Sequence, residues 1–503
     1  MRYSLLFSQR GGGSSVDSSL SIREAIYNLN IDRMVNAACP NAGAAEYFLS
    51  VLSKPLTQVE DINYRREILT DMLNEPTLLD GMAAVFKGYD NLRAESEEMM
   101  GGIFRYGSSQ SAAAMIDCAY ERAYISAHFA RSVIAYLNEL DGLLSGYEPS
   151  SPGLRRIKSF CAEVSGDPLI ADAERSAELF RNETPENYRF RLSLTHDELL
   201  RLKRAELSDI SQKKKERFNP LGAIKFKKKE EIPTVVDIGT SAAENADAAT
   251  AYALEELADY YDALANGLYD RLFGMGNELR FYRAALDLHK RIKGAGLPVC
   301  FPTVLKPEEN RMHSNGICDI LLLNEDKDSS SIVPNSAQLR QGVNGILVRG
   351  DNNCGKTSFL RSVGTAQLFA QSGLFVCAEE FTASIRHGIF SHFSSAEKEF
   401  TDNDAAGRFE GEVKDIASML KKLRPYSLVL LNETFQTTAY KEGAEGMKLI
   451  LDALPINGTK YIFVTHMLTV FNLFGENAGN VLMLKTGEDG EKYKLVAFDP
   501  KQS

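Results

Sequence analysis

The sequence predicts a multidomain protein in which an all-α domain is followed by an α/β domain. Up to about residue 295, apolar residues recur at steps of three and four, the spacing of amphipathic helices. After Leu297-Pro298 the pattern changes to short apolar runs separated by helix-like segments, which is typical of buried, mostly parallel strands. We therefore expect an N-terminal segment over 1–40, a helical domain over 41–295 and an α/β domain over 296–503.

Composition limits the class of protein. The 503 residues suffice for about three domains, and 44% apolar content supports substantial cores. The net charge of −11 argues against a globally basic nucleic-acid coat but is compatible with a local basic patch. Seven scattered cysteines without a C-x-x-C pair indicate reduced thiols rather than disulfides or zinc. Because the N-terminal apolar run is too short for a signal peptide and no run reaches eighteen apolar residues, we expect a cytoplasmic protein without a membrane partner.

Helical spacing predicts the elements of the first domain. The shorter candidate helices lie around 20–35, 43–53, 58–73, 76–87 and 110–141, with a break near 145–153. From 252 to 293 the apolar spacing continues without a proline, which predicts one helix of about forty residues and ~60 Å. Such a helix either crosses between subdomains as an arm or is a plain bundle helix.

An insertion near 201–249 differs in composition from the helices around it. Its basic residues are Lys213, Lys214, Lys215, Arg217, Lys225, Lys227, Lys228 and Lys229. One hypothesis is a DNA contact that neutralises phosphates. The alternative is a solvated insertion, because glutamates flank the lysines and no base-reading pattern is present. The following TSAAENADAAT is either a loop or the start of a helix.

Short apolar runs predict the strands of the second domain. The candidates are ILLL (320–323), GILV (345–348), LFVCA (374–378), YSLVLL (426–431) and KYIFVT (460–465). Near the end, NVLMLKTG and KYKLVAFD flank GEDGE and predict a closing hairpin or edge strands.

A phosphate-binding loop follows the run GILV. It has the form G-x-x-x-x-G-K-[ST] and comprises Gly350, Asp351, Asn352, Asn353, Cys354, Gly355, Lys356, Thr357 and Ser358. Strand, glycine loop and helix occur in the order that phosphate binding requires, which disfavours a chance match in a turn. Backbone N–H groups and the helix N-terminus would surround the phosphates of ATP. Lys356 would contact the β- and γ-phosphates, and Thr357 would bind Mg²⁺.

Two further strands end in polar residues at the edge where the phosphates would lie. YSLVLLNET places Asn432 and Glu433 there. Asn432 can accept a hydrogen bond from a Mg²⁺-bound water but lacks the charge of an aspartate, so Mg²⁺ binding should be weaker. Glu433 is the candidate catalytic base that polarises water. FVTHM places His466 where it either senses the γ-phosphate or is merely structural.

Cys354 lies inside the phosphate loop. A thiolate is favoured near a helix N-terminus, which suggests redox control. The alternative is that Cys354 is a small residue that packs under the loop.

These motifs together resemble a known family. GDNNCGKTSFLRSVG, SLVLLNE and YIFVTHMLTVFNLF resemble the ATPase domain of the MutS DNA mismatch repair family. YFLSVLSKPLTQVEDINYRREILTDMLNEPTLLDGM is similar to the family's helical core, and the helix at 252–293 to its lever. IVPNS is similar to the segment near the adenine, which implicates Ile332 and Val333. The resemblance implies a core/lever domain followed by an ABC-type P-loop ATPase domain that pairs as a homodimer.

The sequence also departs from that family. We expect only about forty residues ahead of the core, no Phe-x-Glu mismatch wedge, and neither C-terminal helices nor a nuclease domain after the ATPase domain. The family's trans signature, Ser-Thr-Phe followed by Glu, corresponds here to AAGRFEGEV, with Gly407, Arg408, Phe409 and Glu412. Arg408 either supplies a charge to the partner's site or is an ordinary surface arginine. We expect a short, divergent MutS-like form without mismatch-binding or connector domains.

Three functions are compatible with these features. The first is a MutS-like ATPase that hydrolyses ATP at a dimer interface and closes its helical arms on DNA, in repair or recombination. The second is an ATP-driven regulatory or remodelling protein that acts on a protein partner, such as a repair protein. The third, a phosphoryl-transferring kinase, is weaker, because no acceptor pocket is visible in the sequence.

Overall fold

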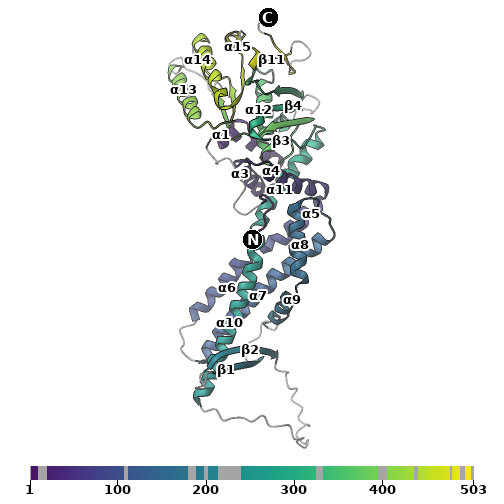
Figure 1. The fold of residues 1–503 in the computed structure, drawn as a ribbon, viewed down its shortest axis with the longest axis vertical. Helices are drawn as coiled ribbons and strands as arrows, with labels where there is room; N and C mark the ends of the chain where they lie inside the picture. The colour runs from purple at the N-terminus through teal and green to yellow at the C-terminus, as the bar shows by residue number, and fades with distance from the viewer. Residues whose placement is uncertain are drawn as a thin grey trace, which may run out of the picture. The chain divides into compact units, whose positions relative to one another are not determined.

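The structure of the protein is a computed structural model. It describes residues 2–8, 20–106, 112–178, 180, 188–196, 202–212, 240–324, 332–394, 405–435, 440–475, 478–487 and 493–499. The chain forms two compact units (Figure 1). Unit 1 comprises Met1–Tyr3, Gly81–Glu148 and Arg156–Gly276, and unit 2 comprises Ser4–Asp80, Pro149–Arg155 and Asn277–Ser503. The domain boundaries expected from the sequence stay a prediction.

Unit 1 is mainly helical. Its helices are α5 (Pro76–Tyr89), α6 (Leu92–Tyr106), α7 (Ala112–Ser145), α8 (Pro152–Gly166), α9 (Pro168–Ala177) and α10 (Thr240–Leu272), of which α5 and α8 begin in unit 2. The long helices α7 and α10 pack side by side (Figure 1). Tyr89 stacks on Tyr269 with ring centroids 5.1 Å apart. The helical patterns at 76–87 and 110–141 correspond to α5 and α7, whereas α6, α8 and α9 were not predicted.

The start of the predicted insertion forms the second strand of a β-hairpin in unit 1. Strand β1 (Tyr188–His196) pairs antiparallel with β2 (Leu202–Gln212). The segment TSAAENADAAT begins helix α10 rather than a loop. The eight basic residues proposed to contact DNA lie outside the described residues.

The single helix predicted over 252–293 is wrong. Helix α10 ends at Leu272, and α11 (Met275–Gly294) begins after a break. Gly274 adopts a φ of 80°, a left-handed conformation that glycine tolerates, and its N–H donates to Asp90 Oδ1 at 2.9 Å. The apolar spacing continues through the break without a proline, so the sequence pattern concealed it.

Helices of unit 2 match the other predicted patterns. They are α1 (Leu20–Asn28), α2 (Ile31–Ala38), α3 (Ala42–Leu52) and α4 (Val59–Asn74). The pattern at 20–35 divides into α1 and α2 because Asn30 takes a left-handed φ of 54°. The side chain of Asn41 caps α3 by accepting a hydrogen bond from the Ala44 N–H at 3.0 Å.

A six-stranded sheet forms the centre of the α/β part. Its order is β12-β11-β6-β10-β9-β8, and pairing is parallel except between β11 and β12. The strands are β6 (Gly345–Arg349), β8 (Ile389–Phe393), β9 (Leu428–Asn432), β10 (Lys460–Thr465), β11 (Val481–Thr486) and β12 (Leu495–Ala497). The strands predicted at GILV, YSLVLL and KYIFVT and the closing hairpin are confirmed.

Helices cover both faces of this sheet. One face packs against α13 (Ala405–Lys421), α14 (Tyr440–Ala453) and α15 (Leu468–Phe474) in one buried apolar cluster (Figure 1). The other face packs against α12 (Lys356–Ala370), which contacts β9 and β10. A Cβ on Gly364 of α12 would lie 2.6 Å from Leu430 Cδ1, so the glycine allows α12 to pack closely on the sheet. The phosphate loop is therefore held between a buried strand and a buried helix.

A second sheet has the order β3-β7-β4-β5. Its strands are β3 (Thr303–Leu305), β4 (Met312–Ile317), β5 (Asn335–Leu339) and β7 (Glu380–Ser384). Two predicted strands are wrong: ILLL forms a 3-10 helix, Ile320–Asn324, and LFVCA makes only an isolated bridge between Val376 and Cys300. Short buried apolar runs do not distinguish strand from helix by periodicity. Among the described residues, no helix combines the length and apolar character needed to cross a membrane.

Candidate nucleotide-binding site

The phosphate loop connects β6 to α12 at the carboxyl edge of the six-stranded sheet. Strand β6 ends at Arg349, and α12 begins at Lys356 after Gly355, whose φ is 86°. A Cβ on Gly350 would lie 2.4 Å from Thr486 Oγ1, so this position accepts no side chain. The two glycines thus allow the turn and the close approach that a backbone phosphate cradle requires.

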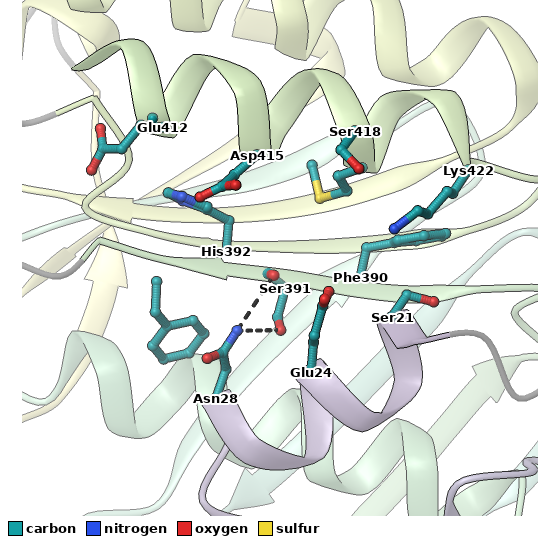
Figure 2. A pocket seen from close by; sticks show the side chains of 13 residues that line it. Ser21, Glu24, Asn28, Phe390, Ser391, His392, Glu412, Asp415, Ser418 and Lys422 are labelled. Carbon is teal, nitrogen blue, oxygen red and sulfur yellow. Dashed lines mark hydrogen bonds between the residues drawn. The ribbon is translucent and has the colours of Figure 1, made fainter. Parts of the chain in front are cut away.

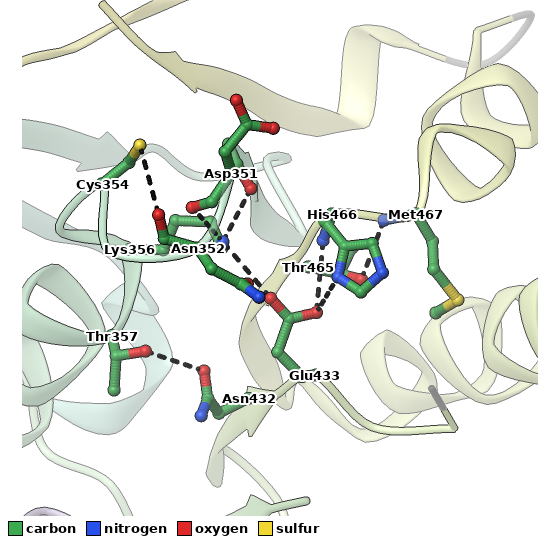
Figure 3. A network of polar contacts seen from close by, with 11 residues as sticks. Asp351, Asn352, Cys354, Lys356, Thr357, Asn432, Glu433, Thr465, His466 and Met467 are labelled. Atoms are coloured by element: carbon green, nitrogen blue, oxygen red, sulfur yellow. Dashed lines mark hydrogen bonds and ion pairs between the residues drawn. The ribbon is translucent and has the colours of Figure 1, made fainter. Parts of the chain in front are cut away.

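Lys356 lies inside the loop, with 4% of the residue exposed. Its Nζ donates to the carbonyl oxygens of Gly350 at 2.6 Å and Asp351 at 2.7 Å. The same Nζ lies 3.3 Å from Glu433 Oε1 (Figure 3). The ammonium group therefore connects the loop to the end of β9.

Thr357 and Asn432 meet beside the loop. The hydroxyl of Thr357 donates to Asn432 Oδ1 at 3.1 Å, as Figure 3 shows. Both oxygens are hard, neutral donors that suit Mg²⁺, directly or through water. The pair of residues predicted to bind Mg²⁺ is therefore brought together, but without a carboxylate.

Glu433 and His466 form a pair at the ends of β9 and β10. Glu433 Oε2 lies 3.0 Å from His466 Nδ1 and accepts the His466 backbone N–H at 3.2 Å. The side chain of Glu433 is 13% exposed and is contacted by Lys356 through its other oxygen. His466 thus contacts the candidate base, a partner that the sequence did not indicate.

A cavity of about 560 Å³ adjoins the loop. Ile332 and Val333, the residues predicted near adenine, form part of its wall together with Asn353 and Ser358 of the loop. Tyr493 also contributes to the wall and was not predicted. No sequence signal could have found Tyr493, because only the fold brings the closing hairpin next to the loop.

Two residues of the expected trans signature, Phe409 and Glu412, contact their own chain. The Phe409 ring packs against Phe435 with centroids 5.5 Å apart. Glu412, which is 8% exposed, accepts hydrogen bonds from Ser394 Oγ at 2.5 Å and the Phe435 N–H at 2.9 Å. The side chain of Arg408 lies outside the described residues.

Cys354 makes a weak contact within the loop. Its Sγ lies 3.8 Å from the Asn352 carbonyl oxygen, and the residue is partly exposed. This contact is compatible with a small residue packed on the loop.

These features define a class of protein. A parallel sheet that presents a phosphate loop, a hydroxyl–amide pair and a carboxylate at one edge is a P-loop nucleotide-binding domain. Residues 346–496 match the family model of MutS domain V. This part of the chain is therefore similar to MutS domain V, and the resemblance to the MutS family is confirmed.

Three relatives illustrate the extent of the similarity. The DNA mismatch repair protein MutS of Synechococcus sp. (strain CC9605) is 34% identical over 167 residues, which cover 32% of this chain and 18% of the relative. The DNA mismatch repair protein Msh3 of Mus musculus is 32% identical over 194 residues, covering 37% and 17%. Endonuclease MutS2 of Lactobacillus helveticus (strain DPC 4571) is 32% identical over 151 residues, covering 30% and 19%. The match therefore spans less than a fifth of each relative.

Proposed function

We propose that this protein is a MutS-like ATPase that binds ATP with Mg²⁺ and hydrolyses it to ADP and phosphate. The observation that carries the proposal is the network in which Lys356 and His466 hold Glu433 beside the phosphate loop. The match to MutS domain V supports the same activity.

Nucleotide binding follows from the loop and the cavity. Backbone N–H groups of the loop and the N-terminus of α12 attract the phosphates. The base would enter the cavity between the Ile332–Val333 wall and Tyr493. Thr357 and Asn432 would hold Mg²⁺, which neutralises charge between the β- and γ-phosphates.

Glu433 is suited to activate water. In the structure Lys356 neutralises its Oε1, while His466 fixes its Oε2. When Lys356 turns toward the phosphates, its ammonium group would leave Glu433 Oε1 free to contact the attacking water. His466 continues to orient the carboxylate, which can then accept a proton from the attacking water.

We propose that a pair of ATPase domains drives the closing of the helical arms. Contacts to the γ-phosphate that form only in the closed dimer would make ATP and ADP favour different states. Arg408 would supply a charge across that interface. The closing arms would come from the helical part of the chain and contact DNA, with the basic residues of 213–229 as the contact. The names of the relatives, which include DNA mismatch repair proteins, support a role in DNA repair or recombination.

The second candidate is a regulatory or remodelling ATPase that acts on a protein partner. The net charge of −11 favours it, because such a charge repels DNA overall. DNA binding of the wild-type protein, titrated with salt, separates the two candidates. Binding that weakens steeply with salt supports the first, and no binding at low salt supports the second.

The ATPase itself is tested by separating binding from turnover. Lys356→Ala should weaken binding of a fluorescent ATP analogue by roughly tenfold or more, because a charge on the phosphates is lost. Glu433→Gln should keep that affinity and reduce turnover by about a hundredfold or more. Full turnover by Glu433→Gln would contradict the role of Glu433.

A further inference from the structure

The loop that carries Glu433 has an unfavourable backbone. Glu433 has a φ of 51° and Phe435 a φ of 63°, and neither is glycine. Two left-handed residues so close together cost free energy, so surrounding contacts must hold them in place. The direction of the Glu433 carboxylate therefore depends on what fixes this loop.

Two polar side chains, His392 and Glu412, hold the loop that carries Glu433. They contact this loop from β8 and α13, not from the phosphate loop. His392 of β8 lies with Nδ1 2.9 Å from Thr434 Oγ1, and Thr434 is 0% exposed. Glu412 of α13 accepts the Phe435 N–H through Oε2 at 2.9 Å. The residues directly after Glu433 are thus each bound to a different neighbouring element.

A third contact fixes the residue before Glu433. The Ser394 N–H donates to the Asn432 carbonyl oxygen at 3.0 Å. The Ser394 hydroxyl donates to Glu412 Oε1 at 2.5 Å, so one carboxylate holds both ends of the loop. Burial of His392 lowers its pKa, although the Glu412 and Asp415 carboxylates oppose that effect. The imidazole is therefore mainly neutral near pH 7 and can hydrogen-bond the hydroxyl of Thr434.

The side chains of His392 and Glu412, which contact the loop that carries Glu433, also line a groove beside β8. The groove holds about 530 Å³ and lies between α1 and α13, with β8 as its floor (Figure 2). Glu24 and Lys422 also contribute to its walls. Neither His392 nor Glu412 belongs to the described wall of the cavity beside the phosphate loop. Changes at these two residues should therefore alter the geometry of Glu433 without removing a nucleotide contact.

We propose that Glu412 and His392 are positioning residues that hold Glu433 in its catalytic direction through Phe435 and Thr434. The proposal rests on the proposed ATPase function. It gives Glu412 a role within its own chain, in addition to any role across a dimer.

The test compares turnover with nucleotide affinity. Glu412→Gln and Thr434→Val each remove one contact to the loop and should lower kcat by roughly tenfold or more, because a small displacement of a catalytic group is costly. Affinity for a fluorescent ATP analogue should stay within about twofold. Thr434→Ser keeps the hydroxyl and should restore most of the turnover.

Matched controls separate positioning from a general effect. Glu24→Gln changes the same charge in the same groove and should leave kcat unchanged, as should Lys422→Gln. In a Glu433→Gln background, Glu412→Gln should cause no further loss, because the group that it positions is already gone.

The outcomes distinguish this inference from the function on which it rests. Normal kcat in both Glu412→Gln and Thr434→Val, with an active wild type, would overturn the inference and leave the ATPase intact. Equal losses of kcat and affinity would also overturn it, since they indicate a general structural effect. Absence of wild-type turnover would overturn both. If Glu412→Gln does not fold, the comparison of Thr434→Val with Thr434→Ser decides.

Discussion

At the scale of single residues, the charge balance of the site is unusual. Lys356 is paired with Glu433, while the position beside Thr357 is the neutral amide of Asn432. A carboxylate at that position would attract a divalent cation more strongly, because charge adds to the oxygen ligands that Mg²⁺ prefers. In the proposed Mg²⁺ site, Asn432 would therefore be the side chain that limits the affinity for the cation.

Asn432→Asp should lower the Mg²⁺ concentration needed for half-maximal ATP turnover by about tenfold. The reason is the added negative charge next to the Thr357 hydroxyl. The measurement is turnover against Mg²⁺ at fixed ATP, with Asn472→Asp on the exposed side of α15 as the control for charge alone. An unchanged Mg²⁺ dependence would argue against Asn432 as a Mg²⁺ ligand.

The sequence predicted the placement of the site residues best where one motif specifies both the local structure and the chemistry. The phosphate loop, Asn432, Glu433 and His466 meet at one edge because parallel strands present their carboxyl ends together. The contact between His466 and Glu433 could not be read from their spacing of 33 residues. Tyr493 was also missed, since its place in the cavity depends on the closing hairpin.

At the scale of elements, β10 begins with a buried cation. Lys460 is 3% exposed, and its Nζ donates to the Val343 carbonyl oxygen. Burial, together with the nearby Arg386, lowers the pKa of Lys460 from 10.5 to about 8. Between those two values the unfolded chain binds the proton more tightly than the folded one, so Lys460 contributes stability that rises with pH.

Lys460→Met should remove that pH dependence. From about pH 7 to about pH 9.5 the wild type should gain about 2 kcal/mol of unfolding free energy relative to the variant. Urea unfolding of both proteins at each pH measures the difference, and Lys421→Met on the exposed side of α13 serves as control. Parallel stability curves for wild type and Lys460→Met would contradict the account.

The elements that sequence analysis missed share a physical cause. Local apolar patterns predicted helix α7, through its one buried face, and strands β6, β9 and β10, through their continuous apolar runs. They did not predict the parallel strand β8. They did not reveal the break at Gly274, since one glycine redirects the chain without disturbing the spacing on either side. They misassigned ILLL and LFVCA, whose conformation depends on tertiary contacts beyond the run itself.

At the scale of the whole molecule, the −11 net charge makes any DNA contact a local property. The basic residues between 213 and 229 are the candidate, and they lie outside the described residues. One of the boundaries between the two compact units falls between Gly276 and Asn277. This boundary is two residues after Gly274, where the helix breaks.

Replacing all eight basic residues from Lys213 to Lys229 with serine should weaken DNA binding and flatten its dependence on salt. Each lost phosphate contact removes released counterions, so the slope of log affinity against log salt should fall by up to about 0.9 per contact. Binding measured over a salt series tests this, with Lys421→Ser at the end of α13 and Lys422→Ser directly after it as control. An unchanged slope would remove the basic segment from the DNA interface.

The central claim is that ATP hydrolysis at this site is coupled to DNA. Steady-state ATP turnover of the wild type, measured with and without duplex and branched DNA, tests it most directly. The account predicts turnover that DNA changes and that both Lys356→Ala and Glu433→Ala abolish. Turnover that is indifferent to every DNA would instead support a protein partner, and the absence of any turnover would contradict the assignment of an ATPase.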